Sequence, residues 1–245
     1  MKKVAIIGAG ISGLFIANLF KKNPNYQIII YEKNTSINLE EGYGIQLSVN
    51  SIKLLNEIGF KKLHTYEKFN PEKIDFYSNK NLNKICELDI TDFNSEDCRY
   101  TTLKRSSLIN FLKRDLEDLI KTGHNILKID QQDKQIKLSF ENNEIKECDY
   151  LIISDGVFSK SKTLISNNNT QPKYNDTLAI RGILNKSPES IDNKNISLFL
   201  GSNFHQVIYP TNNQGDLNFI AIIKYQLSVD CLLYTSDAAD DVRGV

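Results

Sequence analysis

The amino-acid sequence predicts an α/β fold, in which a mainly parallel sheet covered by helices is interleaved with an antiparallel sheet. Two observations predict this architecture. At the N-terminus, a short apolar run, a glycine-rich turn, an amphipathic segment and a second apolar run follow one another, as in a βαβ unit. In the last third of the chain, short stretches of alternating apolar and polar residues are typical of antiparallel strands.

The first half of the chain alternates apolar strands with amphipathic helices. The strands are short runs bounded by polar or glycine residues, which is the pattern of buried parallel strands. The helices carry apolar residues on one face. We expect strands over residues 4–7 and 27–31, helices over 12–22 and 50–58, and a third helix that starts at Ser106 and has an apolar face reaching Leu119.

Strands dominate the remainder of the sequence. A polar turn at 132–134 between two alternating runs predicts a hairpin, and a buried apolar run at 150–153 ends in Ser-Asp-Gly. The expected strands are 73–78, 85–90, 125–130, 135–140, 150–153, 178–184, 196–200, 206–209 and 217–223.

Composition excludes several classes of protein. The chain has 245 residues, of which 40% are hydrophobic and 24% charged, so it is too apolar to be disordered. Thirty basic residues balance thirty acidic ones, which gives no indication of a nucleic-acid or anionic-membrane partner. No apolar stretch approaches the roughly 18 residues of a membrane helix. Glycines interrupt the apolar N-terminus, so we do not interpret it as a signal peptide.

The four cysteines are scattered, with no paired spacing and no histidine at metal-ligand distance along the chain. We therefore expect reduced thiols in a cytoplasmic protein and no metal site. The oligomeric state is not predicted. Residues 231–241 read like the conceptual translation of a sequencing-library adapter, so we expect 231–245 to be a non-native tail; an ordinary C-terminal helix or tail is the alternative.

The glycine-rich turn has the form G-x-G-x-x-G, made by Gly8-Ala9-Gly10-Ile11-Ser12-Gly13. Between a strand and a helix, this pattern is typical of dinucleotide binding. The glycines allow a tight turn, close approach of a pyrophosphate and close helix packing. Glu32 ends the second strand, where a carboxylate accepts both ribose hydroxyls and repels a 2′-phosphate, and Lys33 follows it. The alternative is a glycine-rich turn without a ligand.

Further motifs follow in a fixed order, and they indicate which dinucleotide is bound. They are Gly44-Ile45 within G-x-G-I-x-L, Arg105 before a helix, Asp155 within D-G-x-x-S, Arg181-Gly182, and Tyr209-Pro210. In this order, from residue 1 to about 225, the chain resembles the single-component flavoprotein aromatic hydroxylases, the group of para-hydroxybenzoate, salicylate and ubiquinone-pathway hydroxylases. The resemblance implies a Rossmann-like FAD-binding domain with an interleaved antiparallel substrate-binding sheet.

The resemblance also implies roles for single residues. Arg105 would contact the FAD pyrophosphate or ribityl chain, and Asp155 the flavin and the incoming pyridine nucleotide. Gly44 and Ile45 would approach the flavin ring through their backbone. Arg181 and Tyr209 would face the substrate. The alternatives are a solvated arginine for Arg105, a simple turn for Asp155 and a surface ion pair for Arg181.

The implied activity is hydroxylation of a small aromatic substrate by O₂, with NAD(P)H as co-substrate reducing the FAD. No catalytic side chain is expected. The FAD domain would use residues 1–70 and 100–165, and the substrate sheet 71–99 and 166–230. An FAD-dependent reductase or oxidase of the same superfamily and a non-catalytic dinucleotide-binding module are alternatives. The family's second flavin motif is not seen after Lys224, so we expect residues 1–245 alone to be poorly soluble and uncoupled.

Overall fold

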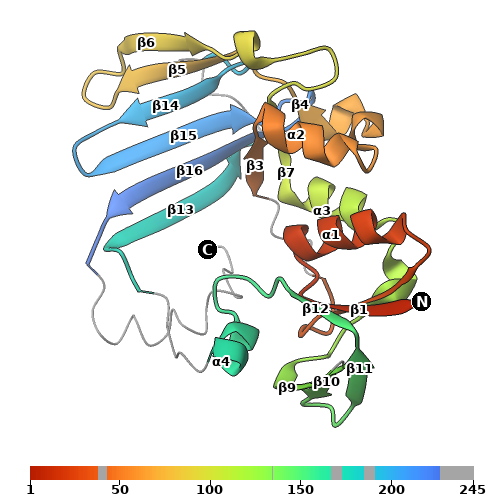
Figure 1. The fold of residues 1–245 in the computed structure, drawn as a ribbon. Helices are drawn as coiled ribbons and strands as arrows, with labels where there is room; N and C mark the ends of the chain where they lie inside the picture. Colours follow the sequence, from red (N-terminus) through yellow and green to blue (C-terminus); the bar gives the residue numbers. More distant parts are fainter. Residues whose placement is uncertain (38–42, 134, 167–172, 185–190, 227–245) are drawn as a thin grey trace.

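The computed structural model describes residues 1–37, 43–133, 135–166, 173–184 and 191–226, and a four-stranded parallel sheet forms its centre. The strand order is β12-β1-β2-β8 (Figure 1). These strands are β1 (Lys2–Ile7), β2 (Tyr26–Tyr31), β8 (Ile120–Lys121) and β12 (Tyr150–Ile153). The βαβ unit predicted at the N-terminus is confirmed, because β1 and β2 pair in parallel around helix α1 (Ile11–Lys21).

Both faces of the parallel sheet are covered, as expected for strands that are apolar throughout. Val4 and Ile6 of β1 belong to the core beneath helices α1 and α3 (Arg105–Lys113). The alternate residues Ala5 and Ile7 pack against a small antiparallel sheet on the opposite face. That sheet contains β9 (Ile126–Gln132), β10 (Gln135–Phe140) and β11 (Ile145–Cys148), and its first two strands form the predicted hairpin.

A six-stranded sheet lies beside this unit (Figure 1). Its order is β13-β16-β15-β14-β5-β6. The strands are β5 (Lys73–Ser78), β6 (Lys84–Asp89), β13 (Thr177–Leu184), β14 (Ile196–Leu200), β15 (Phe204–Pro210) and β16 (Leu217–Lys224). The predicted antiparallel sheet contains one parallel pair, β5 with β14. Those two strands are far apart in the sequence, so the connection is long enough for a parallel crossover.

A three-stranded sheet, in the order β3-β7-β4, lies between the two larger sheets. It is made of β3 (Gly44–Leu47), β4 (Lys68–Phe69) and β7 (Thr101–Lys104), and helix α2 (Val49–Asn56) follows β3. These three strands are not predicted from the sequence pattern. They matter for the site because β7 leads directly into α3, whose first residue is Arg105.

The predicted helix from Ser106 is shorter than its apolar pattern indicated. Helix α3 ends at Lys113, and a 3-10 turn spans Glu117–Leu119. The Leu116 N–H donates to the Lys113 carbonyl oxygen, so the tighter turn satisfies the backbone while Leu116 stays fully buried. The remaining elements are helix α4 (Lys160–Ser166), which was not predicted, and the 3-10 turns Phe60–Lys62, Thr65–Glu67 and Thr91–Phe93.

The predicted domain boundaries stay a prediction, and the expected tail at 231–245 lies outside the described residues. The six-stranded sheet takes its strands from residues 73–89 and 177–224. Among the described helices, none combines the length and apolar character needed to cross a bilayer.

Two buried acidic protons lie in the core between the parallel sheet and the β9–β11 sheet. Burial raises the pKa of Tyr31 to about 12 and that of Cys148 to about 11. The unfolded chain releases these protons at ordinary values, roughly 10 for a tyrosine and 8.5 for a cysteine. Between about pH 9 and 12 the unfolded state therefore binds fewer protons, and stability falls as pH rises.

We accordingly expect the free energy of unfolding to decrease from pH 8 to pH 10.5, by up to about 1.4 kcal/mol per pH unit for each of the two groups. The midpoint of urea unfolding should fall with it. Tyr31→Phe removes one of the two protons and is expected to flatten this dependence. An equally steep alkaline decline in Tyr31→Phe would show that the buried tyrosine does not cause it.

Candidate cofactor-binding site

The glycine-rich turn between β1 and α1 packs tightly against the residues that follow β12. Gly8 has a φ of +101°, and a Cβ at this position would lie 2.5 Å from the Ser154 carbonyl oxygen. A Cβ on Gly13 would overlap the Gly8 carbonyl oxygen and lie 2.7 Å from the Ser154 hydroxyl. The first and third glycines are thus required by the fold itself, as the sequence pattern predicted.

The middle glycine is different, because a Cβ built on Gly10 has no atom of the described residues within 4 Å apart from its neighbours in the chain. Gly10 is the N-cap residue of α1, with an extended backbone and no side-chain cap. The first N–H groups of a helix have no acceptor within the helix, and they carry a partial positive charge. The space beside Gly10 is therefore open toward the end of the helix that attracts phosphate.

Glu32 lies directly beside this turn at the end of β2. Its carboxylate accepts the Ala9 N–H at 2.8 Å and the Asn34 N–H at 3.1 Å. Two backbone donors hold the carboxylate in place, and each oxygen keeps a lone pair for a further hydrogen bond. That capacity is what a ribose with two neighbouring hydroxyls requires.

One cavity of about 430 Å³ joins these features. This volume is within the usual range for small-molecule and cofactor sites. Its lining comes from the glycine-rich turn, the end of β2, the start of β9, the end of β12 and the segment leading into α4. The lining residues are Ile7, Gly8, Gly10, Tyr31, Glu32, Lys33, Asn34, Arg105, His124, Asn125, Ile126, Ser154, Asp155, Gly156, Val157, Phe158 and Lys160.

Arg105 brings a positive charge to the cavity from the first residue of α3. Its backbone N–H donates to the Tyr43 carbonyl oxygen at 2.8 Å. Its half-buried guanidinium makes no hydrogen bond or ion pair with another described residue. A cation is disfavoured at a helix N-terminus, and a bound anion would reverse that penalty.

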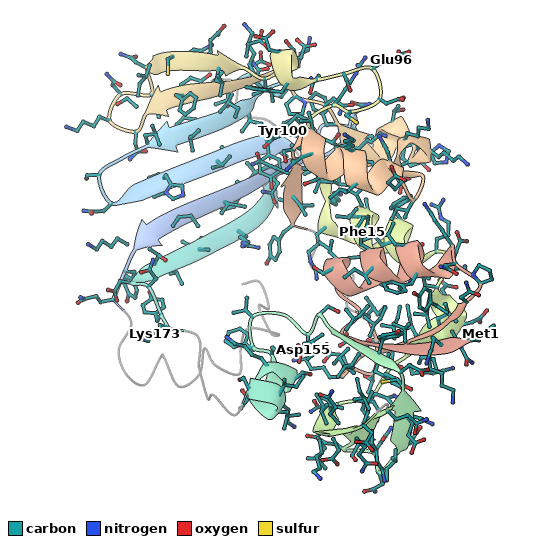
Figure 2. All side chains as sticks on the ribbon, in the orientation of Figure 1. Met1, Phe15, Glu96, Tyr100, Asp155 and Lys173 are labelled. Carbon is teal, nitrogen blue, oxygen red and sulfur yellow. The ribbon has the colours of Figure 1, made fainter. Side chains whose placement is uncertain are left out.

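Asp155 lies where β12 ends and α4 approaches, and Figure 2 shows it beside that helix. Its carboxylate accepts the Ser159 hydroxyl at 2.6 Å and the Ser161 N–H at 3.1 Å. The structure thus shows the turn-forming role, which was the alternative for Asp155. Asp155 also lines the cavity, so its contact with a cofactor stays a prediction.

The other predicted residues lie away from this cavity. Gly44 and Ile45 are in β3, paired with β7. The Arg181 guanidinium lies 6.0 Å from the centre of the Tyr43 ring, on an exposed part of β13. Tyr209 is only 1% exposed, and burial raises the pKa of its hydroxyl. Contact of Arg181 and Tyr209 with a substrate, and of Gly44 and Ile45 with a flavin, stays a prediction.

Sequence reasoning missed the contribution of residues 124–126 to the cavity. The His124 N–H donates to the Glu32 carbonyl oxygen at 2.8 Å, and its ring lies 5.3 Å from that of Tyr31. The imidazole Nδ1 is 2.7 Å from the Thr122 carbonyl oxygen. No motif marks this segment, because its place in the cavity depends on pairing between β2 and the chain after β8. Among the described residues, no cluster of three metal-ligating side chains occurs.

A parallel sheet carries a glycine-rich βαβ turn, a carboxylate at the end of the second strand and an arginine that lines the same cavity. This combination is typical of dinucleotide-binding α/β proteins. The chain belongs to the FAD binding domain family, whose sequence model matches residues 1–231.

The chain is similar in sequence to a monooxygenase and a hydroxylase. The chain is 23% identical over 225 residues to 3-amino-4-hydroxybenzoate 2-monooxygenase of Streptomyces cremeus, with 90% of this chain and 56% of that protein covered. It is 20% identical over 239 residues to salicylate hydroxylase of Pseudomonas putida, covering 90% of this chain and 54% of the relative. The chain thus spans little more than half the length of these relatives.

Solved structures share the fold. Klebsiella pneumoniae HpxO, complexed with FAD and uric acid, matches with a TM-score of 0.83 at 16% identity, covering 97% of this chain and 61% of that one. A salicylate hydroxylase substrate complex matches with a TM-score of 0.75 at 17% identity, covering 94% and 57%. The predicted fold class and family resemblance are confirmed.

Proposed function

We propose that this chain binds FAD in the cavity between β1, β2 and β12, with the adenosine end at Glu32 and the pyrophosphate at Gly10. One observation carries the proposal: the open space beside Gly10, the held carboxylate of Glu32 and the guanidinium of Arg105, which has no partner among the described residues, line a single cavity. Each of these groups recognises a different part of a dinucleotide, and together they fit FAD.

Each residue has a separate task in this arrangement. Gly10 lets phosphate oxygens approach the first N–H groups of α1. Glu32 accepts hydrogen bonds from the ribose hydroxyls. The Ala9 N–H donates to the Glu32 carboxylate and so fixes it relative to the turn. Arg105 supplies the permanent cation that a pyrophosphate requires, and its planar guanidinium bonds two oxygens at once.

We further propose that the chain is the flavin-binding portion of a cytoplasmic monooxygenase that hydroxylates a small aromatic substrate, using NAD(P)H and O₂. FAD supplies the electron transfer and the activation of O₂ when it is bound. The names of the relatives support this class of reaction. The six-stranded sheet, which lies beside the parallel sheet and its helices, offers a surface for the substrate. The protein's part is to bind the cofactor and the substrate, to orient them toward each other and to exclude water from them.

An FAD-dependent reductase or oxidase and a non-catalytic dinucleotide-binding module are the other candidates. A monooxygenase consumes O₂ and oxidises NAD(P)H faster when an aromatic substrate is added. A reductase or oxidase lacks that acceleration by an aromatic, and a binding module shows no turnover at all. Hydroxylated product per NAD(P)H consumed distinguishes the three.

The direct test of the cofactor is spectroscopic. The purified protein should carry a flavin absorption spectrum or regain it after incubation with FAD. Binding of NAD without affinity for FAD would remove both the FAD and the hydroxylase proposals.

Glu32→Ala is expected to weaken FAD binding by about 10- to 100-fold. A charge-assisted hydrogen bond is worth roughly 1.5–3 kcal/mol, which converts to this range of affinity. Titration of FAD fluorescence measures the effect. Glu32→Gln keeps an acceptor for the Ala9 N–H but loses the charge, so we expect it to fall between wild type and alanine. Unchanged affinity in Glu32→Ala would place the ribose elsewhere.

A further inference from the structure

One buried carboxamide connects the six-stranded sheet to β3, whose partner strand β7 precedes the cavity arginine. Asn218 of β16 is 0% exposed, and its neighbours in register are Ile183 and Tyr209. Its Oδ1 accepts the Gly44 N–H at 2.6 Å. Its Nδ2 has no hydrogen-bond partner among the described residues. Burying an unpaired donor costs stability, so this side chain serves the sheet poorly as simple packing.

The approach of β3 to the six-stranded sheet depends on this contact. A Cβ on Gly44 would lie 2.6 Å from the Cβ of Asn218 and 2.8 Å from Cε2 of Tyr209. Only a glycine therefore lets the backbone come close enough to donate to the carboxamide. This close contact within the protein explains why residue 44, in the G-x-G-I-x-L motif, is a glycine.

The same peptide unit is held from its other side. The carbonyl oxygen of Tyr43 accepts the Arg105 N–H at 2.8 Å, while the Gly44 N–H of that peptide donates to Asn218. A peptide bond is planar and stiff, so fixing its N–H restricts its carbonyl as well. The Tyr43–Gly44 peptide therefore connects the carboxamide of Asn218 to the first residue of α3.

We propose that Asn218 is a positioning residue for cofactor binding: through the Tyr43–Gly44 peptide it sets the place of Arg105 in the FAD cavity. This rests on the proposed binding of FAD. Asn218 itself does not line the cavity, so its effect on the cofactor passes through the backbone and Arg105.

A second buried hydrogen bond offers a matched control. Thr102 is 0% exposed, and its hydroxyl donates to the Pro210 carbonyl oxygen, which joins β7 of the three-stranded sheet to β15 of the six-stranded one. It crosses the same interface as the Asn218 bond but does not touch the Tyr43–Gly44 peptide. Thr102→Val removes it with little change in shape.

The experiment compares Asn218→Leu with Thr102→Val in the full chain, by FAD fluorescence titration and thermal melting. We expect both substitutions to lower the melting temperature, but only Asn218→Leu to weaken FAD binding, by about tenfold. Asn218→Asp keeps an oxygen facing the Gly44 N–H and is expected to stay within about threefold of wild type. Equal FAD affinity of the leucine and valine variants would overturn the inference.

Amide hydrogen exchange in the free protein gives a readout that needs no cofactor. Exchange of the Gly44 and Arg105 N–H groups should accelerate in Asn218→Leu and stay unchanged in Thr102→Val. If Asn218→Leu does not fold, Asn218→Ala takes its place in both measurements. Unchanged exchange at Arg105 would overturn the inference, whereas a wild-type chain that binds no FAD would overturn the proposed function first and this role with it.

Discussion

Gly10→Val is expected to abolish detectable FAD binding while the free protein still folds. Apart from its chain neighbours, no described residue has an atom within 4 Å of a Cβ at this position, so we expect the free protein to accept the larger side chain. The backbone of Gly10, with φ at −77° and ψ at −176°, is an extended conformation that valine adopts readily. The cost to the fold is a poorer helix N-cap, about 1 kcal/mol.

The valine side chain would collide with a bound pyrophosphate, because the pyrophosphate must approach the backbone in the space that the isopropyl group occupies. We expect at least 100-fold weaker binding, which corresponds to about 2.7 kcal/mol. Gly10→Ala should give a smaller loss, since its single methyl fills less of the same space. FAD titration and thermal melting on the three proteins check this order. Tight binding by Gly10→Val would mean that the cofactor does not contact this turn.

The elements that could be predicted from the sequence are those whose signal is local. β1, α1 and β2 were predicted to within a residue or two, because each carries its own apolar pattern and the glycine-rich turn separates them. The short strands β3 and β7 could not be predicted in this way. Each has four residues, and each becomes a strand only by pairing with a partner distant in the sequence.

Helix α3 shows a different limit. Its apolar positions continue to Leu119, and the periodicity alone gives no reason to end the helix at Lys113. Leu116 is buried whether the chain continues as an α-helix or tightens into a 3-10 turn, so burial does not distinguish the two. The parallel pairing of β5 with β14 is likewise decided by tertiary packing, not by either strand's own residues.

The candidate site was predictable where its chemistry is carried by side chains next to a motif. Glu32, Arg105 and Asp155 were each singled out from a pattern, and the structure brings all three to one cavity. His124 carries no pattern and reaches the cavity through backbone pairing with Glu32. The role of Asn218 could not be predicted from the sequence either, because it depends on a contact with a glycine 174 positions away in the chain.

Gly8→Ala is expected to destabilise the fold strongly. Two costs add at this position. An L-residue is strained at a φ of +101°, by about 1–3 kcal/mol. The new Cβ would also lie 2.5 Å from the Ser154 carbonyl oxygen, and overpacking of this kind costs typically 1–3 kcal/mol more. The sum, about 2–6 kcal/mol, is a large part of the stability of an ordinary domain.

Gly59→Ala separates these two costs, because Gly59 has a φ of +91° and, apart from its chain neighbours, no described residue within 4 Å of its Cβ position. It carries the backbone strain without the collision, so it should lose about 1–3 kcal/mol. Urea unfolding of both variants measures the difference, which isolates the contact between the turn and the end of β12. Equal loss in the two variants would show that β12 moves away from Gly8 freely. In that case the cavity between β1 and β12 would not be rigid enough to hold a cofactor in one position.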